Sequence, residues 1–319
     1  MSKSGRLTEY KFIMTGAAGF LGRHLAKNLI VEGAAGVGID ICKCPEYLEN
    51  SGMFRYIQGD FGNYEDEALE YLTSFKRGKI VFYHMAGLAN AEKCNESPEI
   101  AFDLNVRLIF QALEFCRRNN IGKIIFPSTG LVYKMDDGKA VDEKVPAAAR
   151  DMYTLTKLAA ESLLQAYSNS YKLCGLTVRL SNVYGPGLSS DTVLGTVLRQ
   201  VIGGGGVRVN DLAPVRDFIH IDDVTEGIIK LSYAIDGPGY TIVNLSTGTG
   251  SSIKDAVEIA CRIASLPLEM IIPAKCSNPS KIVLNNELLR KITGWKPRYN
   301  LEEGLFQTIQ FIMKEQIYT

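Results

Sequence analysis

The chain has 319 residues with 35 Lys+Arg and 35 Asp+Glu, so its formal net charge is 0, and without a basic block it is not expected to bind nucleic acid. Hydrophobic residues make up 46% of the chain, which is enough for a substantial core. No apolar run reaches the ~18 residues of a membrane span, and MSKSGRLTEYKF lacks the apolar stretch of a signal peptide, so a soluble cytoplasmic protein is expected. Seven scattered cysteines and three histidines give neither a disulfide framework nor a zinc spacing, and no metal is expected.

Short apolar runs alternate with longer stretches of helical period through the first half of the chain. Six runs predict strands, at 11–15, 35–40, 54–60, 79–86, 123–129 and 176–182. Helical period extends over 19–33, 97–120 and 153–170. With right-handed crossovers, this alternation predicts an α/β fold, a doubly wound parallel (Rossmann) sheet with a smaller mixed α/β C-terminal lobe.

The first strand runs directly into a glycine-rich turn, KFIMTGAAGFLGRHL. Gly16, Gly19 and Gly22 lie between this strand and a predicted helix, where glycine permits a tight bend and the helix N-terminus attracts a pyrophosphate. The pattern predicts a dinucleotide site, with a glycine-rich turn that binds nothing as the alternative. The predicted cofactor contacts also include Phe20, Leu21, Phe61, Met85 and Ala86.

Two aspartates follow at strand ends. Asp40 lies 18 residues after Gly22, near the ~20-residue spacing of an acid that binds the adenosine ribose. Its carboxylate would repel a 2′-phosphate, which favours NAD over NADP, although Lys43 leaves NADP open. Asp60 is predicted to reach the adenine edge. For both aspartates the alternative is a turn or cap.

Tyr153 and Lys157 are four residues apart on a predicted helix and therefore share a face. An ammonium beside a phenol lowers the phenol pKa, so Tyr153 is predicted to act as general base and acid. Ser128 and Thr129 end a predicted strand, at the edge where doubly wound sheets bind ligands. A surface helix turn is the alternative for the pair alone.

Loops rich in glycine and proline follow Asn182. They predict a boundary near residue 180, with a cofactor domain over 1–180 and a mainly substrate-binding lobe over 181–319. The strand-then-helix pattern of RDFIHIDDVTEGIIKLS indicates that about 215–247 returns to the main sheet. The glycines at 203–206 predict either a nucleotide-approach loop or a flexible turn.

The motifs together resemble the extended short-chain dehydrogenases, specifically the NAD-dependent sugar-nucleotide epimerases and dehydratases. The resemblance covers nearly the whole chain and rests on GAAGFLG, Asp40, HMAG, STGLVY, YTLTK, RLSNVYGPG, RDFIHIDDV and GWKPRYNLEEGL. It implies that Thr129, Tyr153 and Lys157 are catalytic and that Lys157 also holds the nicotinamide ribose. Ser128, beside Thr129, is predicted to contact the cofactor.

Further roles are implied by the same resemblance. Asn105 would support the site, Asn182 would open the substrate loop, and Arg216 would bind the nucleotide diphosphate unless it pairs with Asp217. Arg208 would approach the base. Where the family has an Arg-x-Gly-Asp region this chain has AKCSNPSKIV, so Lys281 or Lys275 would be the second cation. His84 and His220 are predicted to be packed strand residues, and Asp222 and Asp223 helix caps.

The resemblance leaves a choice of reactions. An epimerase that inverts C4 of a sugar nucleotide through a transient 4-keto sugar is favoured. A ketoreductase of a nucleotide-linked 4-keto sugar needs the same three residues. The dehydratase Asp-Glu pair is replaced by Gly130 and Leu131, which argues against a 4,6-dehydratase. A dinucleotide sensor without catalysis would not need Tyr153 and Lys157.

A homodimer is also implied. The predicted helices that contain Asn105 and Tyr153 carry apolar stripes with Phe110, Leu113, Leu158 and Leu163. In the resembling family these two helices pair across a two-fold axis. The alternative is that the stripes only cover the sheet.

Overall fold

The computed structural model describes residues 10–48, 52–73, 79–134, 140–204, 206–268, 271–275 and 280–317. These form two compact units. The first unit contains the described chain up to Val132 together with Ala147–Arg179 and Ile228–Val243. The second contains the described parts of Tyr133–Pro146, Leu180–Gly227 and the chain from Asn244 onward.

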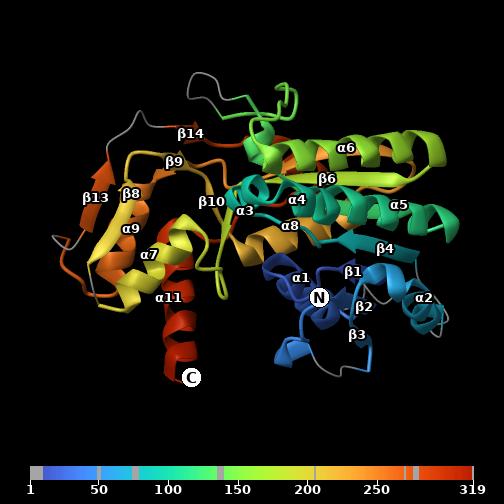
Figure 1. Ribbon diagram of the computed structural model, residues 1–319, viewed down its shortest axis with the longest axis horizontal. Coiled ribbons are helices and arrows are strands. Elements are labelled where there is room, and N and C mark those ends of the chain that lie inside the picture. The colour runs from blue at the N-terminus through green and yellow to red at the C-terminus, as the bar shows by residue number, and fades with distance from the viewer. Residues whose placement is uncertain are drawn as a thin grey trace. The chain divides into compact units, whose positions relative to one another are not determined.

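The first unit is built on a seven-stranded sheet with the order β11-β6-β5-β4-β1-β2-β3 (Figure 1). Its strands are β1 Tyr10–Thr15, β2 Ala35–Asp40, β3 Phe54–Gln58, β4 Lys79–His84, β5 Lys123–Thr129, β6 Cys174–Leu180 and β11 Gly239–Leu245. The strand order reverses between β1 and β4, which are parallel neighbours. The predicted doubly wound parallel sheet is confirmed, and the carboxyl ends of β1 and β4 form its switch point, where such sheets bind ligands.

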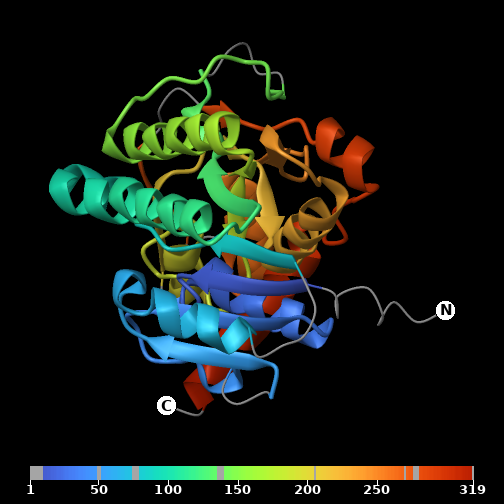
Figure 2. The same ribbon diagram turned by 90° about the vertical axis from the view of Figure 1, so that its right-hand side faces the viewer.

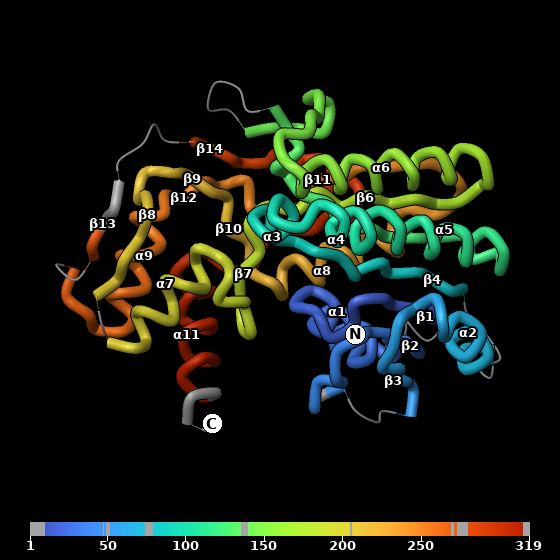
Figure 3. The backbone as a smooth tube through the Cα atoms, in the orientation of Figure 1, coloured from blue at the N-terminus to red at the C-terminus, as the bar shows by residue number. Residues whose placement is uncertain are grey.

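Helices cover both faces of this sheet. They are α1 Phe20–Val31, α2 Glu65–Thr73, α5 Leu108–Arg118, α6 Met152–Tyr171 and the later part of α8 Ile221–Ala234. The short helices α3 Ala91–Glu96 and α4 Pro98–Phe102 pack against α6. Alternate strand residues point to opposite faces. Ile13 and Phe82 therefore pack with α2, α5 and α6 in one apolar cluster, whereas the Tyr83 hydroxyl donates to Ser232 of α8. Figures 2 and 3 show α5 and α6 side by side along the sheet.

The helical stretch predicted over 97–120 is interrupted. Between α4 and α5 the chain makes a π-helical turn, Asp103–Arg107. Such a turn adds a residue to the helix and redirects a side chain, and it is often found at functional sites. The redirected residue is Asn105, which is 1% exposed.

The second unit consists of small sheets and helices. Its strands are β7 Asn182–Tyr184, β8 Val207–Asp211, β9 Val215–Arg216, β10 Phe218–His220, β12 Ser251–Ser252, β13 Ile271–Lys275 and β14 Lys281–Ile282. Its helices are α7 Val193–Ile202, α9 Ile253–Ile263, α10 Glu287–Thr293, α11 Leu301–Ile317 and the start of α8. Of the four glycines, Gly203 caps α7, Gly204 has a φ of 69°, and Gly205 lies outside the described residues.

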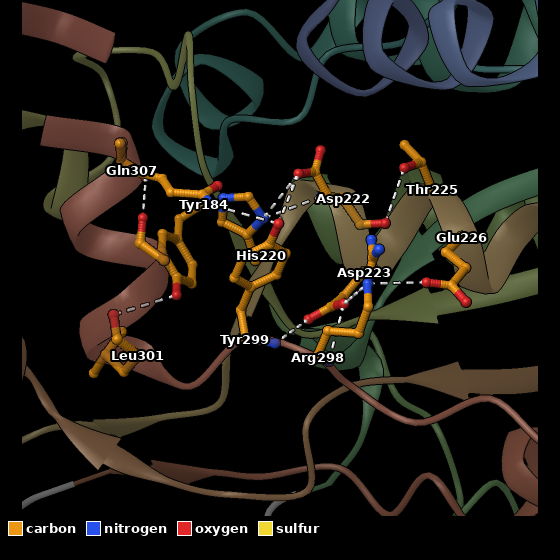
Figure 4. A network of polar contacts seen from close by, with 12 residues as sticks. Tyr184, His220, Asp222, Asp223, Thr225, Glu226, Arg298, Tyr299, Leu301 and Gln307 are labelled. Atoms are coloured by element: carbon orange, nitrogen blue, oxygen red, sulfur yellow. Dashed lines mark hydrogen bonds and ion pairs between the residues drawn. The ribbon is translucent and has the colours of Figure 1, made fainter. Parts of the chain in front are cut away.

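A polar network lies at the start of α8 (Figure 4). Asp222 and Asp223 lie inside the first turn, because α8 begins at Ile221, so the prediction that they cap the helix is wrong. Asp223 is fully buried, and its carboxylate accepts hydrogen bonds from the Arg298 and Tyr299 backbone at 3.0 and 3.1 Å. Asp223 thus anchors the segment that leads into α11.

None of the helices in the described ranges could span a bilayer, since none combines the necessary length with a sufficiently apolar sequence. The same residues contain no group of three or more His, Cys, Asp or Glu side chains that could hold a metal ion.

Candidate active site

The glycine-rich turn between β1 and α1 is folded against the end of β4. Gly16 has a φ of 71°, and its backbone N–H donates to the Ile39 carbonyl at 2.9 Å. A Cβ on Gly16 would lie 2.4 Å from the Ala86 nitrogen, and one on Gly22 would lie 2.0 Å from the Gly16 carbonyl oxygen. Only glycine fits at both positions, which keeps the N-terminal amides of α1 open to an anion. These residues fit a dinucleotide pyrophosphate.

Asp40 connects this turn to the end of β2. Its carboxylate accepts hydrogen bonds from the backbone nitrogens of Ala18 and Cys42, both at 2.9 Å. Each carboxylate oxygen has further acceptor capacity, so the predicted contact with ribose hydroxyls is compatible with this turn. The Asp60 carboxylate accepts a hydrogen bond from Gly62 N at 2.9 Å and caps a short 3-10 helix, Phe61–Asn63. This is the capping role that was the alternative to an adenine contact.

The other predicted cofactor contacts lie around the same switch point. Phe20 and Leu21 open α1, and Met85 and Ala86 follow β4, where the Met85 N–H donates to the Thr15 carbonyl at 3.0 Å. The Phe61 side chain is 5% exposed and packs in the core cluster. Its backbone is therefore the part left for a cofactor contact.

Thr129, Tyr153 and Lys157 are brought together where β5 meets α6. Tyr153 and Lys157 are buried, and Lys157 Nζ donates to the Pro127 carbonyl at 3.0 Å and lies 4.8 Å from the centre of the Phe126 ring. Asp151 is the N-cap of α6 and forms a capping box with Thr154, which fixes the start of the helix at Met152.

The charge states of this group are set mainly by burial. Burial raises the pKa of Tyr153 to about 12, and a hydrogen bond with Thr129 opposes that rise. Burial lowers the pKa of Lys157 to about 8. The predicted lowering of the Tyr153 pKa by Lys157 is therefore wrong for the protein alone, because removal of water from the phenolate has the larger effect.

Asn105 ties three elements together from the π-helical turn. Its Oδ1 accepts from Leu88 N at 2.7 Å, while Nδ2 donates to the Leu88 carbonyl and to Thr156 Oγ1, both at 3.0 Å. Thr156 precedes Lys157 on α6. Asn105 therefore braces the loop after β4 against the helix that carries Tyr153 and Lys157, which agrees with a supporting role.

Ser128 was predicted to contact the cofactor, but its hydroxyl has a partner within the protein. Its hydroxyl donates to Glu161 Oε1 at 2.5 Å, and Glu161 is also paired with Arg179. Glu161 and Arg179 were not among the site residues predicted from the sequence. The available signal was the spacing of 153, 157 and 161, which places three functional groups on one helix face.

The predicted substrate residues lie in the second unit. Arg216 donates to the Val215 and Ser280 carbonyls at 2.9 Å and to Ser280 Oγ at 3.0 Å. Asp217, the alternative partner of Arg216, is instead buried and accepts from Thr247 and Gly248. Strands β9 and β14 are paired in parallel, with Lys281 opposite Val215 and Ile282 opposite Arg216. The Arg216 and Lys281 side chains therefore point to opposite faces of this strand pair.

The remaining predicted substrate residues are not in that pair of strands. Asn182 is exposed at the start of β7, and its N–H donates to the Asp217 carbonyl at 2.8 Å. Arg208 is exposed on β8, which pairs with β13. The Lys275 side chain lies outside the described residues.

Both candidate histidines are buried strand residues, as predicted. His84 Nδ1 is 2.9 Å from Thr15 Oγ1, and burial lowers the His84 pKa to about 3. In the second unit, the His220 ring lies 4.3 Å from that of Tyr299, and Figure 4 shows it between Tyr184 and Asp222. Neutral imidazoles in these positions serve packing.

Similar proteins were found by sequence and by structure. A UDP-glucose 4-epimerase of Mycolicibacterium smegmatis is 27% identical, over 94% of this chain and 97% of its own length. A UDP-glucuronate 4-epimerase of Thermodesulfobacterium geofontis is 26% identical, over 96% and 97%. A solved UDP-glucuronic acid 4-epimerase from Bacillus cereus, in complex with UDP-glucuronic acid and NAD, has a TM-score of 0.85 at 24% identity, and the match covers 96% of this chain and 99% of that one.

The sequence model of the NAD dependent epimerase/dehydratase family matches residues 12–246, which contain the glycine turn, Asp40, Thr129, Tyr153 and Lys157. This match extends over more than half of the chain. The chain belongs to the NAD-dependent epimerase/dehydratase family.

Proposed function

We propose that this protein is an NAD-dependent epimerase that inverts C4 of a nucleotide-linked sugar, with a UDP-sugar as the substrate class. The observation that carries the proposal is the meeting of Thr129, Tyr153 and Lys157 at the carboxyl end of β5. A phenol, a hydroxyl and an ammonium converge there, in the unit that also holds the glycine turn. The named relatives support the choice of a UDP-sugar.

In this mechanism the phenolate form of Tyr153 accepts the proton of the sugar C4 hydroxyl, and the resulting phenol later returns it. When bound, NAD supplies the acceptor and then the donor of the C4 hydride, so the reaction has no net redox change. Thr129 hydrogen-bonds the Tyr153 hydroxyl and stabilises its phenolate. The buried ammonium of Lys157 adds a positive charge on the same helix face, which favours proton removal from the sugar.

Inversion requires that the keto sugar present its other face before hydride returns. The protein controls this step by holding the nucleotide while the sugar turns. Arg216, Lys281 and Arg208 are cationic, and we assign them to the nucleotide diphosphate and base, with Asn182 at the entrance of the substrate loop. The planar guanidinium of Arg216 suits bidentate recognition of phosphate. Lys281 lies on the paired strand β14, but in a register that points its side chain to the opposite face.

The positions after Thr129 argue against dehydration. Gly130 is buried in a short 3-10 helix, Gly130–Val132, and Leu131 packs against the apolar cluster that contains Tyr153 and Cys94. Neither side chain transfers protons. Loss of a sugar hydroxyl would need an acid and a base here, so the site favours a reaction in which only C4 changes.

We further propose a cytoplasmic homodimer. Support for the dimer comes from large apolar side chains that are exposed on α4, α5 and α6, namely Ile100, Phe102, Phe110, Leu155 and Tyr171. Leu113 is buried in the core and Leu163 packs against that core, so these two cover the sheet. Light scattering should give twice the mass of one 35.1 kDa chain. A monomeric mass would contradict the assignment.

Proton NMR of a panel of sugar nucleotides, incubated with the protein and catalytic NAD but no reductant, tests the proposed reaction. We expect C4 inversion of a UDP-sugar. If every sugar is unchanged but nucleotide-linked 4-keto sugars consume stoichiometric NADH or NADPH, the enzyme is a ketoreductase and the proposal is wrong.

A further inference from the structure

Helix α6 presents three buried polar side chains in a column on one face. Tyr153, Lys157 and Glu161 follow one another at four-residue intervals and are 8%, 6% and 4% exposed. The first two belong to the proposed reactive centre. Glu161 lies one turn behind them, and the proposed mechanism gives it no step.

The column contacts strand β5 at three successive residues. Tyr153 hydrogen-bonds with Thr129, Lys157 donates to the Pro127 carbonyl, and Glu161 accepts from Ser128. One polar contact per helical turn fixes the register between α6 and β5. The Ser128–Glu161 contact, at 2.5 Å, is the only one of the three whose partners are both outside the proposed reactive trio.

Arg179 holds Glu161 in this register from β6. Its Nε donates to Glu161 Oε1 at 3.0 Å and its Nη2 to Oε2 at 2.6 Å, a bidentate pair whose side chains are each 5% exposed. Removing two charges from water is costly, and well-packed apolar residues in place of such a pair are often neutral or stabilising. Stability of the fold is therefore a weak reason for a buried ion pair at this position.

We propose that Glu161 and Arg179 are positioning residues for the reaction: they fix Ser128 and the register of β5 on α6, and they place an ion-paired carboxylate one turn behind the Lys157 ammonium. This inference rests on the proposed role of Tyr153 and Lys157. Neither Glu161 nor Arg179 is assigned a contact with substrate or cofactor.

The groups that face Lys157 explain why this charge matters. Burial lowers the Lys157 pKa, whereas Cys94 of α3 and Glu161 act in the opposite direction. Burial raises the pKa of the Cys94 thiol and lowers that of His84 on β4, so both side chains are neutral at working pH, as is the Tyr153 phenol. Glu161, in its ion pair with Arg179, is then the remaining group that raises the Lys157 pKa.

The test uses the full-length protein with NAD and compares pH profiles of kcat for C4 inversion. Glu161→Gln keeps the shape of the side chain and removes its negative charge. We expect kcat to fall at least ~10-fold and the high-pH limb to move down by about half a pH unit, because Lys157 then loses its proton at lower pH. Ser168→Ala, which removes another buried polar contact of α6, should leave both unchanged.

The double variant Glu161→Leu with Arg179→Leu separates positioning from folding. We expect a melting temperature near that of the wild type and a low kcat. Because both charges of the pair are removed together, the high-pH limb should move less than in Glu161→Gln. The inference is overturned if the double variant has the wild-type kcat, or if Glu161→Gln has the wild-type kcat and pH profile. Tyr153→Phe is measured in parallel, since full activity in that variant would instead overturn the proposed function.

Discussion

Replacement of Asn105 by alanine tests whether the π-helical turn is a brace for the active site. The substitution removes three hydrogen bonds, to both backbone groups of Leu88 and to Thr156 Oγ1, at 2.7 to 3.0 Å. At about 1 kcal/mol for each bond, the free energy of unfolding should fall by about 3 kcal/mol. Because Thr156 adjoins Lys157, kcat should fall as well.

Urea unfolding followed by circular dichroism measures the free-energy change, and Asn119→Ala is the matched control. Asn119 ends α5 and makes one side-chain hydrogen bond, from Nδ2 to the Phe115 carbonyl at 3.0 Å. Its loss should lower the free energy of unfolding by about 1 kcal/mol. Equal losses in the two variants would refute the view that Asn105 braces the site.

Two further predictions concern the sheet edge. Gly16→Ala should abolish NADH binding in a titration of cofactor fluorescence, because the added Cβ would meet Ala86 N at 2.4 Å and the φ of 71° is strained for alanine; binding at wild-type affinity would contradict the proposed cradle. His84 has a pKa of about 3 in the folded protein against about 6.5 unfolded, so the unfolded state binds the extra proton and stability is lost as pH falls below 6.5. Between pH 7 and pH 5 this amounts to about 2 kcal/mol, and His84→Phe should lose less stability over that interval in urea titrations; an unchanged pH dependence would rule out His84 as the source.

The sheet and the glycine turn were predictable because their signals are local. Apolar runs of strand length and the spacing of Gly16, Gly19 and Gly22 follow from backbone geometry alone. The convergence of Tyr153, Lys157 and Thr129 also followed from two local facts, the helical interval and the end of a strand. Family membership was predicted from the order of the motifs and is confirmed.

The contacts that support the site were not predictable in this way. Glu161 and Arg179 are 18 residues apart on a helix and a strand, and no local pattern joins them. Helical period over 97–120 gave no sign of the π-helical turn that directs Asn105 inward. Asp223 has the sequence position of a cap, yet its partners come from the chain more than 70 residues later.

The pKa of Tyr153 could not be predicted from the local sequence either. Sequence spacing shows that Lys157 shares its helix face but carries no measure of burial. In the folded protein burial raises the pKa of Tyr153 to about 12, and the hydrogen bond with Thr129 opposes that rise only in part.

The central claim is that Tyr153 moves the proton of a sugar C4 hydroxyl. The most direct measurement is the rate of C4 inversion of a UDP-sugar by the wild type and by Tyr153→Phe, both loaded with NAD and followed by proton NMR. General acid–base catalysis by a positioned side chain contributes about 10²- to 10⁴-fold, so the variant should lose at least ~100-fold in kcat while it still binds NAD. Tyr153→Phe with wild-type kcat would contradict the claim.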